Sequence, residues 1–443
     1  MQVTETNADG LKREFKVIIP AQQFQDRIES RLRDRQRSMR LPGFRPGKVP
    51  MTLVNKHFRQ HVLGEELERT IGDSSAQVVS ERGLRPAGQP KIEITAFNDG
   101  ADLEYNMAIE LLPEIEPMDF ATLELTRTSV DIPDTEIDKA VERLAKEQAK
   151  SEPVTEPRPA AIDDVLVIDF VGRIDGEEFE GGKAEGHYLR LGSNTLIPGF
   201  EDQLVGATVG EKRDVNVTFP VEYPRKELAN RPAVFEVTVN ELRQLIPAAI
   251  DDELAKGVGL ESLDALRQRV REQLQADYDG ASRARLKRQL LDKLAESHEF
   301  EMPPGLVETE FQAIWRQVET DRKSGAVDPE DKDKTEEQLR DEYRAIAARR
   351  VKLGLLLSEV GRRAHVEVKQ DEITRAVMND ARRYPGQERR VVEYYQNTPE
   401  ALAQLRAPLY EDKVVDYILD VAKVTDRKID PDQFAAELKD GAA

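Results

Sequence analysis

The chain has 443 residues, with 65 Lys and Arg, 85 Asp and Glu, and a formal net charge of −20. This length predicts two to four domains. The absence of cysteine excludes disulfides, thiol nucleophiles and cysteine-ligated metal sites. Charged residues make up 34% of the chain and hydrophobic residues 39%. This balance favours extended helical parts with a large surface over one compact globule.

The charge is unevenly distributed. Residues 27–59 contain ten Lys and Arg and only two acidic residues. On an acidic chain, this basic segment predicts a local docking site for a negatively charged partner, whereas the net charge argues against general nucleic-acid binding. The first residues lack the apolar core of a secretory signal, and the apolar run in 351–361 is too short to span a bilayer. We therefore expect a soluble cytoplasmic protein.

The first region, residues 1–112, reads as α+β. A strand is expected at 11–20, followed by a helix that carries Phe24, Ile28, Leu32 and Met39 on one face. Two Pro-Gly breakers predict a loop after Arg40. A second helix follows, and the clean alternation of apolar and polar residues over 101–111 predicts a half-buried strand.

The next two segments differ in character. Residues 113–150 predict a connector strand and a helix that starts at Pro133. Residues 151–245 contain short β-like runs separated by Gly and Pro turns, with one short helix expected over 200–206. This pattern predicts a mainly antiparallel β domain of common size.

Residues 246–443 are charged and helical. Leucine, valine and tyrosine residues recur at helical spacing, and a proline pair at 303–304 separates two helices. We expect the polar tail after Asp430 to be frayed. Two interpretations stay open for Phe311, Ile314 and Trp315: they line an open binding surface, or they pack within one helical arm.

The chain lacks the sequence motifs that most classes of enzyme need for catalysis. His57 and His61 have the i, i+4 spacing of two metal ligands, but the glutamate of a zinc-protease motif is missing between them, so solvated or packing histidines are expected. No phosphate-binding, nucleophile-elbow or dinucleotide-binding motif occurs. We therefore expect no metal, no cofactor and no ATP-driven step.

The β segment resembles the FKBP-type prolyl isomerases. The resemblance rests on DGEEFEGG at 175–182 and LIPGFEDQLVGATVGE at 196–211. Three positions depart from the usual pattern: Phe200 stands where a tryptophan is frequent, His187 where a phenylalanine is common, and Glu180 where an aspartate is frequent. The resemblance places the catalytic pocket at Phe170, Phe179, Glu180, Leu196, Ile197, Phe200, Tyr223 and Phe235.

The chemistry of such a pocket requires no nucleophile. An X-Pro bond rotates over a barrier of roughly 18–20 kcal/mol, because amide resonance must be broken. A dry aromatic pocket favours the twisted amide over the planar, more dipolar one. Leu196, Ile197 and Phe200 bracket a Pro-Gly turn and are read as pocket, whereas Phe170 and Phe235 are also compatible with simple core packing.

The flanks resemble the bacterial trigger factor family over essentially the whole chain. The sequence GFRPGKVP at 43–50 is similar to the family's ribosome-binding loop, and LLLSEVGRRAHVEV with the run after it is similar to the helical arms. The resemblance implies that Phe44, Arg45 and Lys48 contact a ribosomal protein and rRNA of the large subunit beside the exit tunnel. The resemblance assigns ribosome binding to six residues of this loop: Gly43, Phe44, Arg45, Pro46, Gly47 and Lys48.

The resemblance implies an ATP-independent chaperone for nascent and unfolded polypeptides, partly ribosome-bound, with a homodimer off the ribosome and no membrane or DNA partner. It divides the chain into a ribosome-binding α+β head (1–112), a connector (113–150) that packs with the C-terminal body, an FKBP-like antiparallel β domain with one short helix (151–245), and an elongated all-α body with two arms (246–443). A free-standing isomerase and a holdase with an inactive isomerase domain stay open as alternatives. A nucleic-acid-binding function is a more distant alternative, because no aromatic-basic platform for RNA accompanies the basic segment.

Overall fold

The structure is a computed structural model that describes residues 1–38, 44, 47–98, 100–326, 329–332 and 334–440. The chain forms two compact units. The first comprises residues 1–127 and 284–425, and the second comprises residues 128–283 and 426–443. Each unit is described here by itself.

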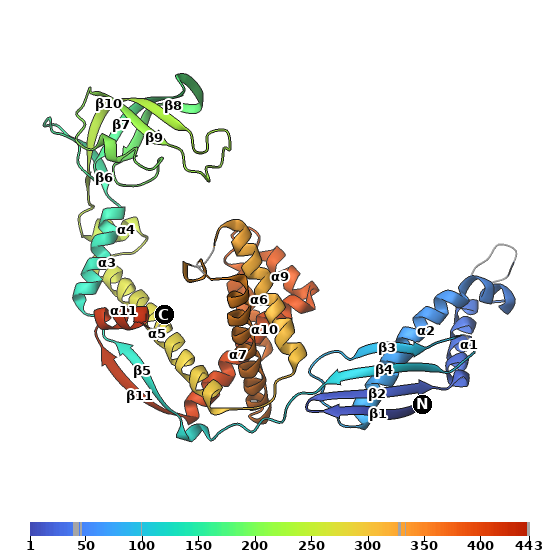
Figure 1. Cartoon of the computed structure of the whole chain (residues 1–443). Helices are drawn as coiled ribbons and strands as arrows, with labels where there is room; N and C mark the ends of the chain where they lie inside the picture. Colours follow the sequence, from blue (N-terminus) through green and yellow to red (C-terminus); the bar gives the residue numbers. More distant parts are fainter. Residues whose placement is uncertain (39–43, 45–46, 99, 327–328, 333, 441–443) are drawn as a thin grey trace. The chain divides into compact units, whose positions relative to one another are not determined.

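A four-stranded antiparallel sheet begins the first unit (Figure 1). Its order is β1-β2-β4-β3, and β2 pairs with β4 so that Phe15 lies opposite Met107 and Val17 opposite Tyr105. Alternation of apolar residues puts these four side chains on one buried face. The strands are β1 (Gln2–Asp9), β2 (Lys12–Ile19), β3 (Lys91–Ala96) and β4 (Leu103–Glu110).

One helix covers that buried face, and a second helix packs against the first. Helix α2 (Met51–Glu81) packs Val78 against the sheet, and its buried Ser74 hydroxyl lies 2.6 Å from the Tyr105 hydroxyl. Helix α1 (Ala21–Ser38) packs against α2 through Phe24, Ile28 and Leu32. The predicted apolar face of α1 is thus present as far as the described residues extend; Met39 lies outside them.

The rest of the first unit is helical. Leucines of the C-terminal half of α5 pack with α7 and α10 around Leu290, Leu356 and Ile418, all fully buried. Residues 115–125 complete this core. The helices are α5 (Leu263–Ser297), α6 (Pro304–Ser324), α7 (Glu336–Arg363), α8 (Gln370–Ala381), α9 (Glu388–Asn397) and α10 (Pro399–Val421), with short 3-10 turns η1 (Phe120–Thr122) and η3 (Pro329–Asp331).

Two helical hairpins extend this core. Phe311 and Trp315 of α6 are 1% and 4% exposed and pack against Leu339 and Ala347 of α7. The Trp315 indole also lies under the Arg340 guanidinium, 4.4 Å from the ring centroid. These residues therefore serve packing within the arm rather than an open surface. Helices α8, α9 and α10 share a second cluster.

A five-stranded antiparallel sheet organises the β domain of the second unit. Strand β10 pairs with β6, β7 and β9, and β7 pairs with β8, so that the sheet wraps around a core of Leu166, Ile168, Val215 and Val237. The predicted short helix is the 3-10 turn η2 (Asp202–Leu204). The strands are β6 (Lys150–Pro153), β7 (Val165–Ile174), β8 (Glu177–Arg190), β9 (Lys212–Thr218) and β10 (Pro232–Ile246).

Short helices complete the second unit. Helix α3 (Asp134–Glu147) buries Ile137 and Val141 with α4 (Asp252–Gly257) and the first half of α5. Strand β5 (Glu124–Val130) pairs with β11 (Lys423–Ile429). The tail expected to be frayed instead forms α11 (Pro431–Asp440), because Phe434 is buried against Tyr278 and anchors the helix.

The predicted fold class, a multidomain chain that combines an α+β head, an FKBP-like β domain and a helical C-terminal region, is confirmed. Strands β1, β3 and β11 were not anticipated from the sequence. The four domain ranges stay a prediction. The two compact units divide the chain in a different way and do not test those ranges.

Candidate functional sites

The β domain contains a cavity of about 280 Å³ at one end of its sheet. Seven of the eight residues predicted for the pocket line this cavity, together with Phe219, Pro220 and three residues of its rim. Phe200 and Phe235 are 2% and 4% exposed, so they form its floor and also belong to the core. The seven are Phe170, Phe179, Leu196, Ile197, Phe200, Tyr223 and Phe235.

Edge-to-face contacts fix the aromatic rings. Phe200 and Phe235 have ring centroids 5.3 Å apart, and Phe170 lies 6.0 and 5.8 Å from these two rings. Phe219 lies 4.8 Å from Tyr223 and 5.8 Å from Phe179. Such arrangements each add about 0.5–1.5 kcal/mol beyond burial, so the cavity wall is preorganised.

Two glycines make room for Phe179. A Cβ at Gly172 would lie 2.5 Å from Phe235 and 2.9 Å from Phe179, and a Cβ at Gly182 would lie 2.8 Å from Phe179. Contacts this short do not occur between real Cβ atoms and their neighbours. The close approach of this ring therefore explains Gly182 of the DGEEFEGG motif and, on strand β7, Gly172.

Two carboxylates near the cavity, those of Glu180 and Asp169, are not part of its lining. Glu180, predicted in the pocket, is exposed and is not among the described residues that line the cavity. Its carbonyl oxygen accepts a hydrogen bond from the Arg225 guanidinium at 2.7 Å. Behind Phe170, the Asn240 side chain and the Gly186 N–H hydrogen bond to Asp169 and lower its pKa.

Phe219 is a cavity residue that the sequence analysis missed. It directly precedes Pro220 and lies four residues before Tyr223, in the same loop. The Phe-Pro step at the end of a β-like run could have indicated a residue that turns inward at the cavity edge.

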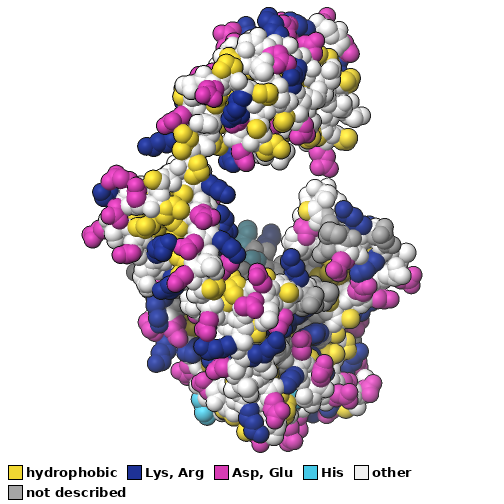
Figure 2. Space-filling model, turned by 90° about the vertical axis from the view of Figure 1, so that its left-hand side faces the viewer, with side chains coloured by type: hydrophobic (Ala, Val, Ile, Leu, Met, Phe, Trp, Pro, Cys, Tyr) yellow, Lys and Arg dark blue, Asp and Glu magenta, His cyan; other side chains and the backbone are white. Residues whose placement is uncertain are grey.

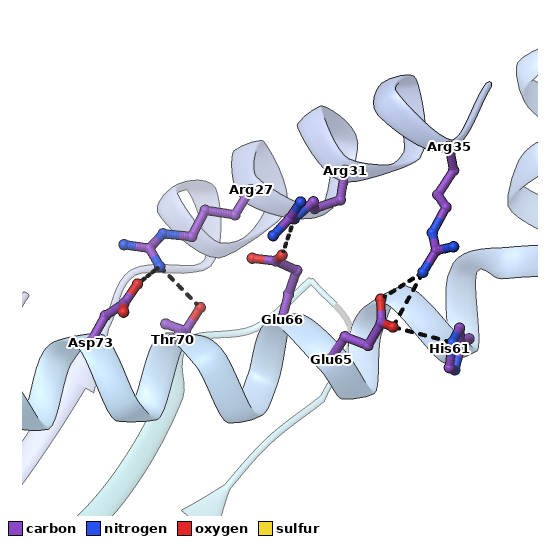
Figure 3. A network of polar contacts seen from close by, with 8 residues as sticks. All are labelled: Arg27, Arg31, Arg35, His61, Glu65, Glu66, Thr70 and Asp73. Atoms are coloured by element: carbon purple, nitrogen blue, oxygen red, sulfur yellow. Dashed lines mark hydrogen bonds and ion pairs between the residues drawn. The ribbon is translucent and has the colours of Figure 1, made fainter. Parts of the chain in front are cut away.

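The head has a ladder of ion pairs between α1 and α2 (Figure 3). Arg27 contacts Asp73 at 3.0 Å, Arg31 contacts Glu66 at 2.7 Å, and Arg35 contacts Glu65 at 3.3 Å. Arg31 donates this hydrogen bond to the buried carboxylate of Glu66, and the bond raises the pKa of the Arg31 guanidinium. Figure 3 also shows Thr70 beside Asp73, where its hydroxyl accepts a hydrogen bond from Arg27, and His61 beside Glu65 at one end of the ladder.

These ion pairs bear on the interpretation of the basic segment 27–59 as a docking site for a negatively charged partner. The acidic partners on α2 lie just beyond residues 27–59, and Arg33 and Arg37 pair with acids of α1 itself. Three of the ten cations therefore bridge the two helices of the hairpin, and two more are paired within α1. On the face of the molecule that Figure 2 shows, which does not include this hairpin, cationic and anionic side chains are interspersed and hydrophobic side chains form small patches.

The loop at the end of this hairpin is partly described. Phe44 is 41% exposed and Lys48 is exposed, whereas Gly43, Arg45 and Pro46 lie outside the described residues. Gly47 has a left-handed φ of +76°. The Gln36 side chain donates to the Val49 carbonyl at 2.6 Å and joins the end of α1 to the segment before α2.

In the part of the chain that the structure describes, no group of three or more His, Cys, Asp or Glu residues could hold a metal ion. Among the described helices, none is both long and apolar enough to cross a membrane.

Comparisons with known proteins agree with this geometry. Residues 1–144 match the model of the bacterial trigger factor protein, residues 156–240 that of the FKBP-type peptidyl-prolyl cis-trans isomerase, and residues 262–420 that of the trigger factor C-terminus.

Curated relatives match over nearly the full length. The trigger factor of Paramagnetospirillum magneticum is 52% identical over 99% of this chain and 96% of its own length, and that of Rhodospirillum centenum is 51% identical over 97% and 96%. A solved trigger factor chaperone structure shares the fold, with a TM-score of 0.53 and 18% identity over 95% of this chain and 99% of its own. The chain therefore belongs to the bacterial trigger factor family, and it is a ribosome-associated chaperone that carries an FKBP-type peptidyl-prolyl cis-trans isomerase domain.

Proposed function

We propose that the aromatic cavity of the β domain is the site at which X-Pro bonds of client chains are isomerised. The observation that carries this proposal is the convergence of Phe170, Phe179, Leu196, Ile197 and Phe200, from separate strands and loops, on one apolar cavity. Tyr223 and Phe235 complete its lining. The prolyl ring enters between these side chains and rests on Phe200 and Phe235.

The chemistry proposed for the cavity is conformational. Rotation about the X-Pro bond reduces the dipole of the amide, so a water-poor aromatic surrounding stabilises the twisted amide relative to the planar one. The rings are held by one another, and little reorganisation is needed when the amide twists. Glu180 lies outside the lining, so its proposed role is confined to the rim, where it contacts the client chain beside the proline.

We propose further that residues 43–48 contact the large ribosomal subunit near the exit tunnel. The loop joins the two helices of the hairpin that the ion-pair ladder stiffens, and it presents an exposed aromatic at Phe44 and an exposed cation at Lys48. Stiff framing lowers the ordering cost on binding, and a cation suits rRNA phosphates and acidic protein groups. Gly43, Arg45, Pro46 and Gly47 belong to the same proposed contact.

The remaining proposals concern the cellular setting. The protein acts in the cytoplasm, shields nascent and unfolded polypeptides without ATP, and pairs with a second copy when it is off the ribosome. Neither a membrane nor DNA is a partner. Charge of mixed sign between small apolar patches supports weak, reversible binding of varied clients (Figure 2).

Two variants separate the proposed activities. Phe200→Ala should lower isomerisation of a proline peptide and leave co-sedimentation with vacant ribosomes unchanged. The triple change Phe44→Ala, Arg45→Ala and Lys48→Ala should do the reverse. Lys56→Ala, which removes an exposed cation of the same basic segment, is the matched control and should bind ribosomes nearly normally.

The outcomes distinguish the alternatives. If Phe200→Ala, correctly folded, isomerises normally, the cavity is not the active site. If wild-type protein binds clients but does not isomerise, the holdase alternative is correct. Absence of ribosome binding at low salt would favour a free-standing isomerase, and equal loss in Lys56→Ala would replace the loop contact with a general charge effect.

A further inference from the structure

A buried carboxylate lies directly behind the cavity wall. Glu201 follows Phe200 in the chain and is 5% exposed. Its Oε1 accepts hydrogen bonds from the Thr195 N–H at 2.9 Å, the Ser193 hydroxyl at 3.1 Å and the Leu196 N–H at 3.4 Å. Its Oε2 accepts from the Asn194 N–H at 3.0 Å.

These bonds set the conformation of the loop 192–197. Asn194 has a left-handed φ of +54°, which is uncommon for a residue other than glycine and turns successive N–H groups toward one point. The carboxylate at that point satisfies all three N–H groups of residues 194–196. Without it, the loop would have three amide donors facing a buried, unfilled position.

The same short element is fixed to the sheet on its other side. The Gln203 side chain donates to the Gly199 and Asn216 carbonyls at 2.7 and 2.8 Å and accepts from the Asn216 N–H at 3.1 Å. Residues 199–203 are thus tied to β9. Glu201 connects this anchored element, which carries the floor residue Phe200, to the loop that carries the wall.

We propose that Glu201 is a positioning residue for prolyl isomerisation. It touches neither substrate nor the reacting bond. It holds Leu196 and Ile197 at a fixed distance from Phe200, so that wall and floor form one rigid apolar surface before a client arrives. This inference rests on the proposed site, and its test is designed to fail separately from that site.

The chain offers a matched control in Asp164. This carboxylate is 6% exposed in the same domain and accepts from the Arg158 guanidinium at 2.5 and 2.8 Å and from the Ala161 N–H at 2.8 Å. It is not among the residues that line the cavity. Asp164→Asn removes a buried charge and an acceptor, as Glu201→Gln does, but leaves the wall anchored.

The experiment compares Glu201→Gln and Asp164→Asn in the full chain, with a proline tetrapeptide as substrate and at a temperature where both remain folded. A glutamine must place its NH₂ group against at least one N–H of the loop, so the wall loosens. We expect kcat/KM to fall about tenfold in Glu201→Gln, mainly through a higher KM, because the loop must then be ordered on binding. Asp164→Asn should stay within about twofold of wild type.

A second readout reports on the loop itself. In wild-type protein, the amides of residues 194–196 should exchange slowly with solvent and resonate at low field in NMR spectra, as carboxylate-bound amides do. Both features should be lost in Glu201→Gln and retained in Asp164→Asn. If Glu201, like Asp164, only stabilised the fold, both variants would have a lower thermal midpoint and neither would have a changed KM.

Three results would overturn the inference. The first is a Glu201→Gln variant in which the amides of residues 194–196 exchange faster but KM and kcat stay at their wild-type values. The second is a loss of activity in Asp164→Asn as large as that in Glu201→Gln. If Glu201→Gln does not fold, Ser193→Ala removes a single donor to the same oxygen, and unchanged kinetics with unchanged amide exchange there is the third. Phe200→Ala assayed in parallel identifies a failure of the site itself, because it would then be as active as wild type.

Discussion

Glu359 is the carboxylate for which the structure supports the sharpest stability prediction. It is 7% exposed near the end of α7 and contacts the guanidinium groups of Arg362 at 2.6 Å and Arg363 at 2.8 Å, with Arg85 at 3.5 Å. Arg363 also donates to the Ile115 carbonyl at 2.8 Å. Hydrogen bonds from Arg362, and then those from Arg363, lower the pKa of Glu359 from 4.5 to about 2.

The perturbation is Glu359→Gln. A pKa lowered from 4.5 to about 2 corresponds to about 3 kcal/mol of stabilisation of the ionised form in the native state. The three arginines are half exposed, and solvent screening reduces the expected loss at pH 7 to about 2 kcal/mol. Because the folded pKa is depressed, this stabilisation is complete above pH 4.5 and is lost as the pH falls toward 2.

The assay is urea unfolding followed by tryptophan fluorescence. Trp315 is the only tryptophan and packs against α7, the helix that carries Glu359, so the signal reports on the first unit alone. The difference between wild type and Glu359→Gln should be largest at pH 7 and smaller at pH 3. Glu393→Gln, which breaks an exposed pair with Arg389, should cost less than about 0.5 kcal/mol. A difference that does not change with pH, or no difference, would refute the reasoning.

Two further predictions concern the second unit. Gly182→Ala should lower isomerisation roughly ten- to a hundredfold with little loss of stability, because the added Cβ would lie 2.8 Å from Phe179 and displace its ring; a peptide isomerisation assay checks this, and unchanged turnover would contradict it. Phe434→Ala should cost about 3 kcal/mol, because this 1% exposed side chain anchors α11 against Tyr278. Hydrogen exchange of the α11 amides should then become fast, and continued protection would show that other contacts hold the helix.

The cavity was partly predictable from the sequence because Phe179, Leu196, Ile197 and Phe200 lie in two compact motifs, whereas Phe170, Tyr223 and Phe235 lie outside them. The positions around Pro198 and Phe179 are recognisable by type and spacing. Glu180 was placed by its neighbour in the motif, yet alternation along β8 turns it outward. Glu201 was not identified, since a single acid after an aromatic carries no signal that three backbone amides will converge on it.

Elements stabilised by partners were the ones the sequence analysis missed. Strands β1 and β3 are polar edge strands, and only pairing with β2 and β4 defines them. Helix α11 is short and has one buried anchor. A local signal was present, however: Asp430 accepts from the Gln433 N–H at 2.8 Å, and Pro431 occupies the first turn.

The basic segment shows a limit of counting charges along a chain. Residues 27–59 are strongly cationic in sequence, but three of their arginines, Arg27, Arg31 and Arg35, pair with acids of α2, the second helix of the same hairpin. Charge in a window of sequence therefore overestimates the charge available to a partner wherever two helices of opposite sign lie side by side.

The pairing of β6 with β10 bears on how the β domain is connected to the rest of the chain. Lys150 and Ile246 are register partners, so the chain enters and leaves this domain at neighbouring points, roughly 5 Å apart as in any antiparallel pair. A segment joined in this way can be lost or exchanged without stretching the polypeptide on either side. The isomerase domain can thus be gained, lost or transferred as a cassette, with selection acting on it independently of the chaperone that carries it.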